Sequence, residues 1–594
     1  MRYKTSCFNP TLFRQNLCRF WPLPVGVFAY YLLSVVMPFW EIKNWAPLNE
    51  AMFRDHVLAS IYGDAQMASF VMVFFAALAA ALMFRHIHAR KDLQFYLGLP
   101  MTRTCIYVTN LVSGYLMLAV PVILNMIILG ITTLVWGYGF LSLPMTGCIL
   151  SAVTIFYGLA VLASVLGGQT FGAFLIYLGL NIALYLVSMT SGEIMNWLLH
   201  GWNMGSPFYD VVQKLTPAAQ YLELSIWEQV EGSGIYEFRE GFMIPVYALA
   251  GAVIMVLSGW LYNIRRSETT GDTVSFQVVK PICKVFVALI VGMGLALFLL
   301  SSLQREMDLD FISILIPVLI FTVVGWIAAE MVIKKSFRVV NKRECLGCGI
   351  LLVALIALGL GLETGGLGYE TRTPDPEQVV SVNAKNIEMT TEDALSLHRY
   401  VIEHPQELSN GTGSYAWDTL AMNYTMEDGT VFSRFYYVKA GSSVDAYLES
   451  VLSKKDYIFQ SWLGDLNLEV PNGGYVYFFE NYEEDEENPT AYFKKVDREM
   501  LYNQSLSSVD AAKLYGAICQ DIEEGNLPPR AYADHEKYHR KLVAEVSFEI
   551  KGKVPVEAAE GISAQAVQTV FVNIDPTMEN TMEALREMGY EYVG

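Results

Sequence analysis

One segment contains the residue types of a zinc hydrolase, since His535 and His539 are one helical turn apart and Glu536 follows the first of them. In such a site the two imidazoles bind the metal and the glutamate activates a water molecule. However, Arg540 and Lys541 follow directly, whereas the helix that carries such a site is usually buried and uncharged. We therefore expect a surface helix here, with a zinc peptidase as the weaker alternative.

Two other signatures of chemistry are incomplete. Cys345 and Cys348 form a Cys-x-x-Cys pair, but a zinc ribbon needs a second pair and the sequence has none, so we interpret them as small packing residues. No Gly-x-x-x-x-Gly-Lys-Ser/Thr segment, which would cradle the phosphates of a nucleotide, is present. We therefore predict no catalytic residue, no metal site and no cofactor site in this chain.

The segment 85–103 is basic and carries apolar residues at helical spacing before a turn at Pro100. Its cations include Arg90, Lys91 and Arg103. This pattern predicts a short amphipathic helix closed by a turn, which would be a docking surface for a soluble partner. The alternative is that the positive charges only fix the orientation of the neighbouring membrane spans.

A second short helix is expected over 10–19, where Asn9 would cap the helix and Pro10 would occupy its first turn. Its apolar residues share one side, which predicts an interfacial helix lying on a membrane surface. The alternative is that this segment is only the basic flank of the first membrane span.

Composition indicates which elements must position these segments. Of the 594 residues, 53% are hydrophobic and 17% are charged, yet the net charge is −19. Residues 1–363 contain 20 acidic and 22 basic side chains, whereas residues 364–594 contain 39 acidic and 18 basic ones. This split predicts a large membrane domain followed by an acidic, water-soluble domain, and it argues against a simple soluble enzyme.

Nine transmembrane helices are predicted. Residues 104–192 contain no Asp, Glu, Lys, Arg or His, and this run alone is long enough for three spans of about 20 residues. The nine spans are expected near 20–40, 62–84, 106–135, 144–166, 170–190, 243–263, 285–303, 311–333 and 345–362.

The charges of the connecting segments predict the orientation of these spans. Lys and Arg are concentrated before the first span and after the second, sixth and eighth spans, whereas the alternate segments are acidic. Because basic segments prefer the cytoplasm, we predict a multi-pass protein of the cell membrane with a cytoplasmic N-terminus and residues 364–594 outside. Glu330, inside the eighth span, is expected to pair with Lys334 rather than to serve a proton or ion path.

Residues 364–594 contain a single cysteine, so this domain must be stabilised by its own core. We expect two α+β repeats, over about 388–460 and 505–590. Each would open with a helix, capped by Thr390 or Ser507, and continue with a β-hairpin and a closing helix. The acidity of the domain marks a solvated surface and predicts no nucleic-acid partner.

Leu99-Pro100-Met101-Thr102-Arg103 resembles the Leu-Pro-x-[Ser/Thr]-Arg turn of bacterial ABC-2-type transporter permeases, because it follows a basic segment and precedes a long span. Pro121 within the third span is also similar to that family, as are the Ser206-Pro207 and Thr216-Pro217 pairs after the fifth span. The family's six-helix unit would correspond to residues 1–265 of this chain.

The remaining residues resemble a subset of Firmicutes permeases with an added extracellular C-terminal domain. Three additional transmembrane helices would occupy residues 266–363, and the acidic α+β domain would occupy residues 364–594. The resemblance implies the permease subunit of an ATP-binding-cassette transporter that exports or extrudes a substrate.

In such a transporter ATP is hydrolysed by a separate ABC ATPase subunit on the cytoplasmic side, so this chain would itself hold no cofactor. The resemblance assigns the interfacial-helix role to 10–19. It assigns the ATPase-coupling role to Arg90, Lys91, Leu99, Pro100 and Arg103. It also implies a second permease, in a homodimer or in a heterodimer with a paralogue. The competing hypothesis is a membrane-anchored extracellular sensor or receptor.

Overall fold

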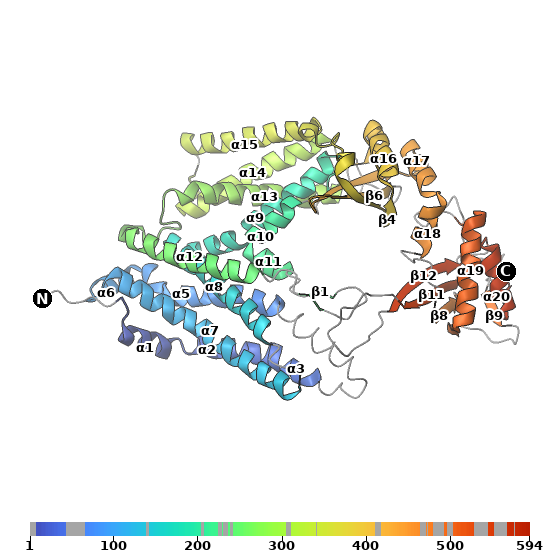
Figure 1. Cartoon of the computed structure of the whole chain (residues 1–594). Coiled ribbons are helices and arrows are strands. Elements are labelled where there is room, and N and C mark those ends of the chain that lie inside the picture. The colour runs from blue at the N-terminus through green and yellow to red at the C-terminus, as the bar shows by residue number, and fades with distance from the viewer. Residues whose placement is uncertain are drawn as a thin grey trace. The chain divides into compact units, whose positions relative to one another are not determined.

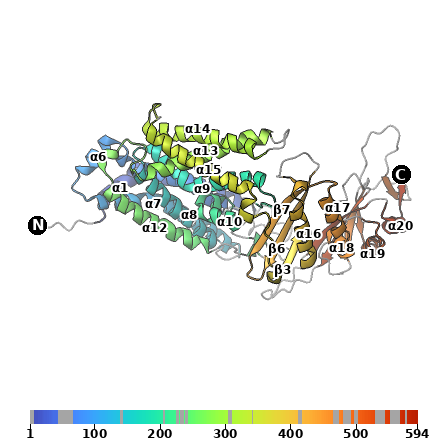
Figure 2. The ribbon, with the colours of Figure 1, turned by 90° about the horizontal axis from the view of Figure 1, so that it is seen from above.

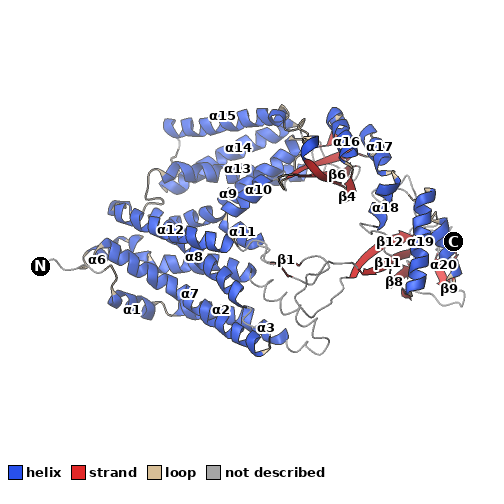
Figure 3. Cartoon of the chain, in the orientation of Figure 1, coloured by secondary structure: helices blue, strands red, loops and turns tan. Residues whose placement is uncertain are grey.

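Helices dominate the structure, and most of the strands lie in the C-terminal part of the chain (Figure 3). The chain divides into two compact units, the first of which contains most of residues 1–360 and the second Asn196–Asn203, Val230–Ile235 and Gly361–Gly594. The computed structural model describes residues 7–42, 66–137, 142–203, 207–223, 228–229, 236–237, 242–303, 310–339, 341–409, 417–463, 471, 473–478, 492–495, 503–527, 544–551, 567–574 and 577–593.

Nine helices within the described residues are long and apolar enough to cross a membrane (Figure 1). They are Pro22–Trp40, which comprises α2 (Pro22–Tyr31), a π-helical stretch (Leu32–Val36) and most of α3 (Met37–Ile42), then Gln66–Met83, which ends with α5 (Met72–Met83), α7 (Arg103–Val135), α8 (Ser142–Leu166), α9 (Thr170–Leu198), α12 (Met243–Ile264), α13 (Val279–Leu303), α14 (Phe311–Lys334) and α15 (Lys342–Glu363).

Each predicted span therefore coincides with an apolar helix, although several helices are longer than expected. α9 continues to Leu198, past Glu193, where the uncharged run has already ended. α13 begins at Val279 and includes Lys280 and Lys284. A helix is held together by its backbone hydrogen bonds, so it can continue through charged residues. Those residues shorten only the apolar part that could lie in a membrane.

α8 is the most buried of these helices, and it contacts α5, α7 and α12 (Figure 1). It approaches α12 closely at Gly158, where an added Cβ would lie 2.8 Å from the carbonyl oxygen of Gly251. Two glycines facing each other allow the helix backbones to touch, which is how helices in membranes gain packing energy without burying surface from water.

α13, α14 and α15 run alongside one another (Figure 2). Ala288, Gly292 and Ala296 recur every four residues and form a buried stripe on α13. An added Cβ at Gly292 would collide with Thr322 of α14, so this stripe brings the two helices together. Most side chains of α15, by contrast, are exposed, as expected of a helix that faces lipid.

The first sheet of the second unit has five antiparallel strands in the order β4-β3-β6-β7-β5. Helices α16 and α17 contribute to its buried core. The elements are β3 (Val379–Ala384), β4 (Ile387–Met389), α16 (Thr391–Glu403), β5 (Leu408–Ser409), β6 (Trp417–Met426), β7 (Val431–Lys439) and α17 (Ser443–Leu452).

The second sheet has four antiparallel strands in the order β10-β8-β11-β12, and its core includes side chains of α19 and α20. Helix α18 (Lys455–Leu463) contributes Tyr457 to the first core and Trp462 to the second. The remaining elements are β8 (Gly473–Phe478), β10 (Asn503–Leu506), α19 (Ser508–Glu524), β11 (Ala544–Lys551), β12 (Val567–Ile574), α20 (Glu579–Glu587) and the pair β9 (Tyr492–Lys495) and β13 (Tyr590–Val593).

Both predicted helix caps in this unit are confirmed. The hydroxyl of Thr390 accepts a hydrogen bond from the backbone N–H of Asp393 at 3.3 Å, and Ser507 accepts one from Asp510 at 3.2 Å. Each cap satisfies an N–H that the helix itself leaves unpaired. The hairpin turn between β6 and β7 is confirmed as well, with Gly429 at a positive φ of 78° that other residues rarely adopt.

Candidate partner-docking site

The basic segment after the second long helix forms a short helix and a turn, as the sequence predicts. A 3₁₀ turn (Arg85–Ile87) leads into α6 (Arg90–Leu97), and α7 starts at Arg103. The backbone N–H of Gly98 donates to two carbonyls of the last turn of α6, which ends the helix. Thr102 then caps α7 by accepting from the N–H of Cys105 at 3.2 Å.

Two of the five predicted coupling residues attach this segment to the helical unit. Arg90 donates to the carbonyl oxygen of Thr270 at 3.3 Å. Arg103 donates to the carbonyl oxygens of Asn263 and Arg265, at 3.3 Å and 3.2 Å. Both arginines therefore hold α6 and its turn against the end of α12 and the residues after it.

Arg265 is the central residue of this attachment. Its buried guanidinium donates to the carbonyl oxygens of Ser164 at 3.3 Å, Val165 at 3.2 Å and Ile87 at 3.1 Å. These carbonyls belong to the end of α8 and to the 3₁₀ turn before α6, so one side chain joins both to the end of α12. Burial lowers the pKa of the guanidinium to about 10, which still leaves it charged at neutral pH.

Two buried histidines lie directly before α6. The Nε2 atom of His86 is 3.0 Å from the hydroxyl of Tyr262, and its ring stacks on Tyr96 of α6 with the centroids 4.5 Å apart. The Nε2 atom of His88 is 2.9 Å from the carbonyl oxygen of Ser164, to which it donates. Burial lowers the pKa of both imidazoles to about 4, and the positive charge of Arg265 adds to this.

We expect acid to release this segment. The ordinary pKa of an imidazole is 6.5. Between pH 6.5 and pH 4, the two histidines therefore bind protons when the segment is released into water but not when it is packed. The packing free energy is thus fully present above pH 6.5 and falls as the pH drops towards 4. Hydrogen exchange of residues 85–103, corrected for intrinsic rates, should show much weaker protection at pH 5 than at pH 7.5.

The variant His86→Phe supplies the control for this prediction. Phenylalanine keeps a flat ring against Tyr96 but does not titrate, so the loss of protection at pH 5 should become smaller. Equal protection of the native segment at pH 5 and pH 7.5 would show that the two imidazoles do not control its packing.

The other predicted coupling residues lie differently. Lys91 and Pro100 are exposed, and Leu99 is half-buried. Phe95, which the sequence-based prediction does not include, is 66% exposed on α6. Aromatic side chains are enriched at the centres of protein interfaces, so an exposed phenylalanine on a short, firmly held helix is a candidate contact residue for a partner. The sequence could have indicated Phe95, because on a helix over residues 90–97 Phe95 lies one turn after Lys91 and therefore on the same side.

The predicted helix over 10–19 is confirmed as α1 (Pro10–Arg19), with Asn9 accepting hydrogen bonds from the N–H groups of Thr11 and Leu12. Its attachment is more polar than expected. The buried side-chain amide of Asn16 donates to Asn110 at 2.8 Å and to Ser113 at 3.2 Å, both on α7.

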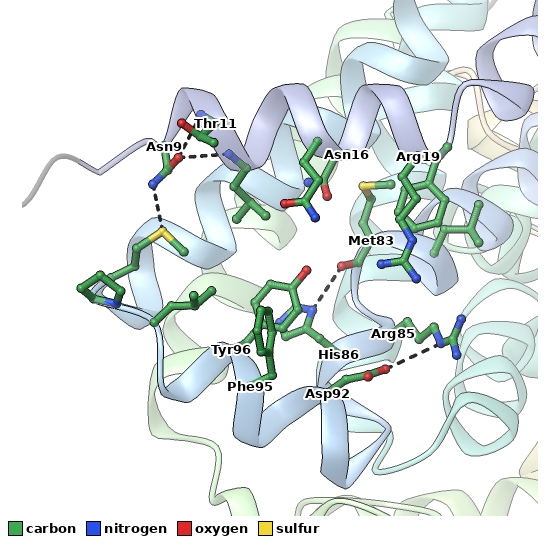
Figure 4. A pocket seen from close by; sticks show the side chains of 17 residues that line it. Asn9, Thr11, Asn16, Arg19, Met83, Arg85, His86, Asp92, Phe95 and Tyr96 are labelled. Atoms are coloured by element: carbon green, nitrogen blue, oxygen red, sulfur yellow. Dashed lines mark hydrogen bonds and ion pairs between the residues drawn. The ribbon is translucent and has the colours of Figure 1, made fainter.

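A cavity of about 330 Å³ lies between α1 and α6 (Figure 4). Side chains of both helices line it, together with the end of α5 and the turn before α7. Leu99, Pro100 and Phe95 are among the lining residues, so the predicted coupling turn and α1 share one cavity.

Glu330 pairs with Lys334 at 2.5 Å, which confirms the predicted ion pair. The structure adds two partners that sequence spacing does not indicate. Lys284 of α13 also pairs with Glu330, and it pairs with Glu344 of α15 at 2.6 Å. The four charges join three helices at one end and neutralise one another, as buried charges must.

No group of three or more His, Cys, Asp or Glu side chains that could hold a metal ion occurs in the part of the chain that the structure describes. His535, Glu536 and His539 lie outside those residues. Comparisons with protein-family models, curated proteins and solved structures give no match for this chain.

Proposed function

We propose that this chain is the permease subunit of an ABC-2-type transporter that exports or extrudes a substrate and is driven by a separate ABC ATPase. Residues 1–265 would form the six-helix permease unit, 266–363 three additional transmembrane helices and 364–594 an extracellular domain. A second permease, identical or paralogous, would complete the assembly.

The observation that carries this proposal is the construction of α6. It is a short helix of eight residues, and Arg90, Arg103 and Arg265 hold the segment around it against the ends of α8 and α12. Its exposed side presents Lys91 and Phe95 to a partner. A helix held this firmly would transmit a push on its exposed side to the long helices, which is what a mechanical coupling to ATP hydrolysis requires.

ATP hydrolysis tests this proposal. If a neighbouring gene encodes an ATPase with a Gly-x-x-x-x-Gly-Lys-Ser/Thr segment, the chain is purified with that ATPase and the two are reconstituted together in liposomes. We expect the hydrolysis rate of the pair to differ severalfold from that of the ATPase alone. Unchanged hydrolysis in the presence of the chain would argue against a transporter subunit.

Chemical labelling tests the proposed orientation. The exposed residues Val509, on α19, and Phe337, between α14 and α15, are each replaced by cysteine in a background without the exposed Cys7, Cys18 and Cys345. A membrane-impermeant maleimide should label Val509→Cys in intact cells and Phe337→Cys only after permeabilisation. The reverse pattern would contradict an extracellular C-terminal domain.

We further propose that the extracellular domain consists of two repeats. The orders β4-β3-β6-β7 and β10-β8-β11-β12 are equivalent. In each half, two of these four strands come first in the chain and are followed by a helix. The hairpin of the other two strands comes next, and a second helix closes the half. Both repeats would then begin earlier than residues 388 and 505, since β3 and β8 belong to them.

A membrane-anchored sensor is the second candidate, and one group of contacts favours it. The residues that directly follow α9 belong to the strand-containing unit: Gly201 accepts hydrogen bonds from the N–H of Phe435 at 3.4 Å and from the hydroxyl of Tyr369 at 3.3 Å. The N–H of His200 also donates to Glu370 at 2.7 Å. A ligand bound to the outer domain could therefore displace the end of the fifth span.

A further inference from the structure

The cavity between α1 and α6 has an uneven distribution of charge. Arg19 and Arg85 lie on the same side of it (Figure 4). Arg85 is 3.8 Å from Asp92, a long and exposed ion pair that contributes little stability. Arg19 forms no ion pair with any carboxylate that the structure describes, and its guanidinium lies 5.2 Å from the centre of the Phe20 ring. The site thus has two arginines for one acid.

One wall of the cavity is apolar and lies beside the ends of the first two long helices, whereas polar side chains such as Asn9, Gln15 and Asn16 line other parts of it. Leu82 and Met83 end the second long helix, and α1 immediately precedes the first one. Leu12 and Phe20 line the cavity from α1 and from the residue that follows it. Trp21, next in the chain, is 60% exposed, as is common for tryptophan at a membrane–water boundary.

We propose that this cavity binds the head group of an anionic phospholipid. The phosphate would lie between Arg19 and Arg85, and the first part of the acyl chains would follow the apolar wall. This inference rests on the membrane embedding proposed above and not on the ATPase.

Charge complementarity favours a lipid over a protein segment. Basic pockets beside membrane spans attract anionic head groups, and in the proposed orientation this cavity faces the cytoplasmic leaflet, which is negatively charged. A cavity of about 330 Å³ is at the lower end of the size of ligand sites, so it can enclose a head group but not a whole lipid.

Binding is measured on the delipidated full chain, without any partner, by native mass spectrometry with phosphatidylglycerol or phosphatidylcholine. We expect the native chain to prefer phosphatidylglycerol. In Arg19→Gln/Arg85→Gln the affinity for that lipid should fall about 30-fold, because each basic group near anionic lipid contributes about 1 kcal/mol and 1.4 kcal/mol is tenfold. Arg14→Gln is the matched control, since Arg14 is an exposed arginine of α1 outside the cavity.

A steric variant, Thr11→Trp, enlarges a side chain of the lining without changing any charge and should also weaken binding. Equal affinity for the two lipids, or an equal loss in Arg14→Gln, would overturn the proposal. Displacement of the lipid by millimolar inorganic phosphate would show a simple anion site and would overturn it too. Because the ATPase is absent from this experiment, its outcome is independent of the proposed transporter function.

Discussion

Replacing Phe95 by alanine should weaken the association of this chain with the ATPase that we propose as its partner about 30-fold. The ring is 66% exposed on α6, and a central aromatic anchor of an interface typically contributes about 2 kcal/mol, which corresponds to that factor. Lys91→Glu should add to the loss, and its share should shrink at high salt because exposed charges are screened. The dissociation constant of the purified chain and the ATPase, measured in detergent, checks both.

Phe337→Ala is the matched control for Phe95→Ala. Phe337 is 89% exposed between α14 and α15, on the side that we also predict to be cytoplasmic, but it lies outside α6. We expect its replacement to leave the affinity unchanged. If the two alanine variants lose affinity equally, the exposed side of α6 is not the docking surface.

Replacing Arg265 by alanine should cause the largest loss of stability of any single change near the site. Three carbonyl groups lose a charged donor. Those of Ile87 and Ser164 keep another donor, the hydroxyl of Thr270 at 3.3 Å and the Nε2 atom of His88 at 2.9 Å, so the carbonyl of Val165 is affected most. Hydrogen bonds to charged groups contribute about 1.5 to 3 kcal/mol each, so we expect a loss of on the order of 3 kcal/mol. The thermal unfolding midpoint of the purified chain should fall by several degrees.

The neighbouring arginine provides a control of equal charge. Arg266 is exposed, so Arg266→Ala should leave the unfolding midpoint within about a degree of the native value. Arg265→Lys should be intermediate, because an ammonium group keeps the charge but cannot reach three carbonyls at once. Equal midpoints for Arg265→Ala and Arg266→Ala would mean that the side chain of Arg265 does not hold the segment.

The long helices and the local signals could be predicted from the sequence because each depends on residues close in the chain. An uncharged run is a sufficient signal for an apolar helix, and Thr390 and Ser507 cap helices that begin at the next residue. α6 follows from the spacing of its own apolar residues, and its end follows from Gly98.

The residues that hold the site together could not be predicted in this way. Arg265 and Arg266 are adjacent and chemically identical, and only the carbonyls of Ser164, Val165 and Ile87, distant in sequence, determine that the first is buried. The sequence-based coupling set likewise treats Arg90 and Lys91 alike, although one contacts Thr270 and the other is exposed.

The strands that begin each sheet of the second unit were missed for a similar reason. β4 has only three residues, and it is stabilised by pairing with β3 and by the core beneath it. β10 has four residues and pairs with β8, whose residues lie 25 or more positions earlier. Short edge strands of this kind carry too few residues for an alternating pattern to identify them.

Affinity purification of the tagged chain from its native membranes tests the central claim most directly, with every co-purified protein identified and quantified by mass spectrometry. We predict that a protein with a Gly-x-x-x-x-Gly-Lys-Ser/Thr segment co-purifies in a near-equal molar amount. It should be lost from the preparation of the Lys91→Glu/Phe95→Ala variant while the variant itself remains folded. Purification of the folded chain without any such ATPase would contradict its assignment as a transporter subunit.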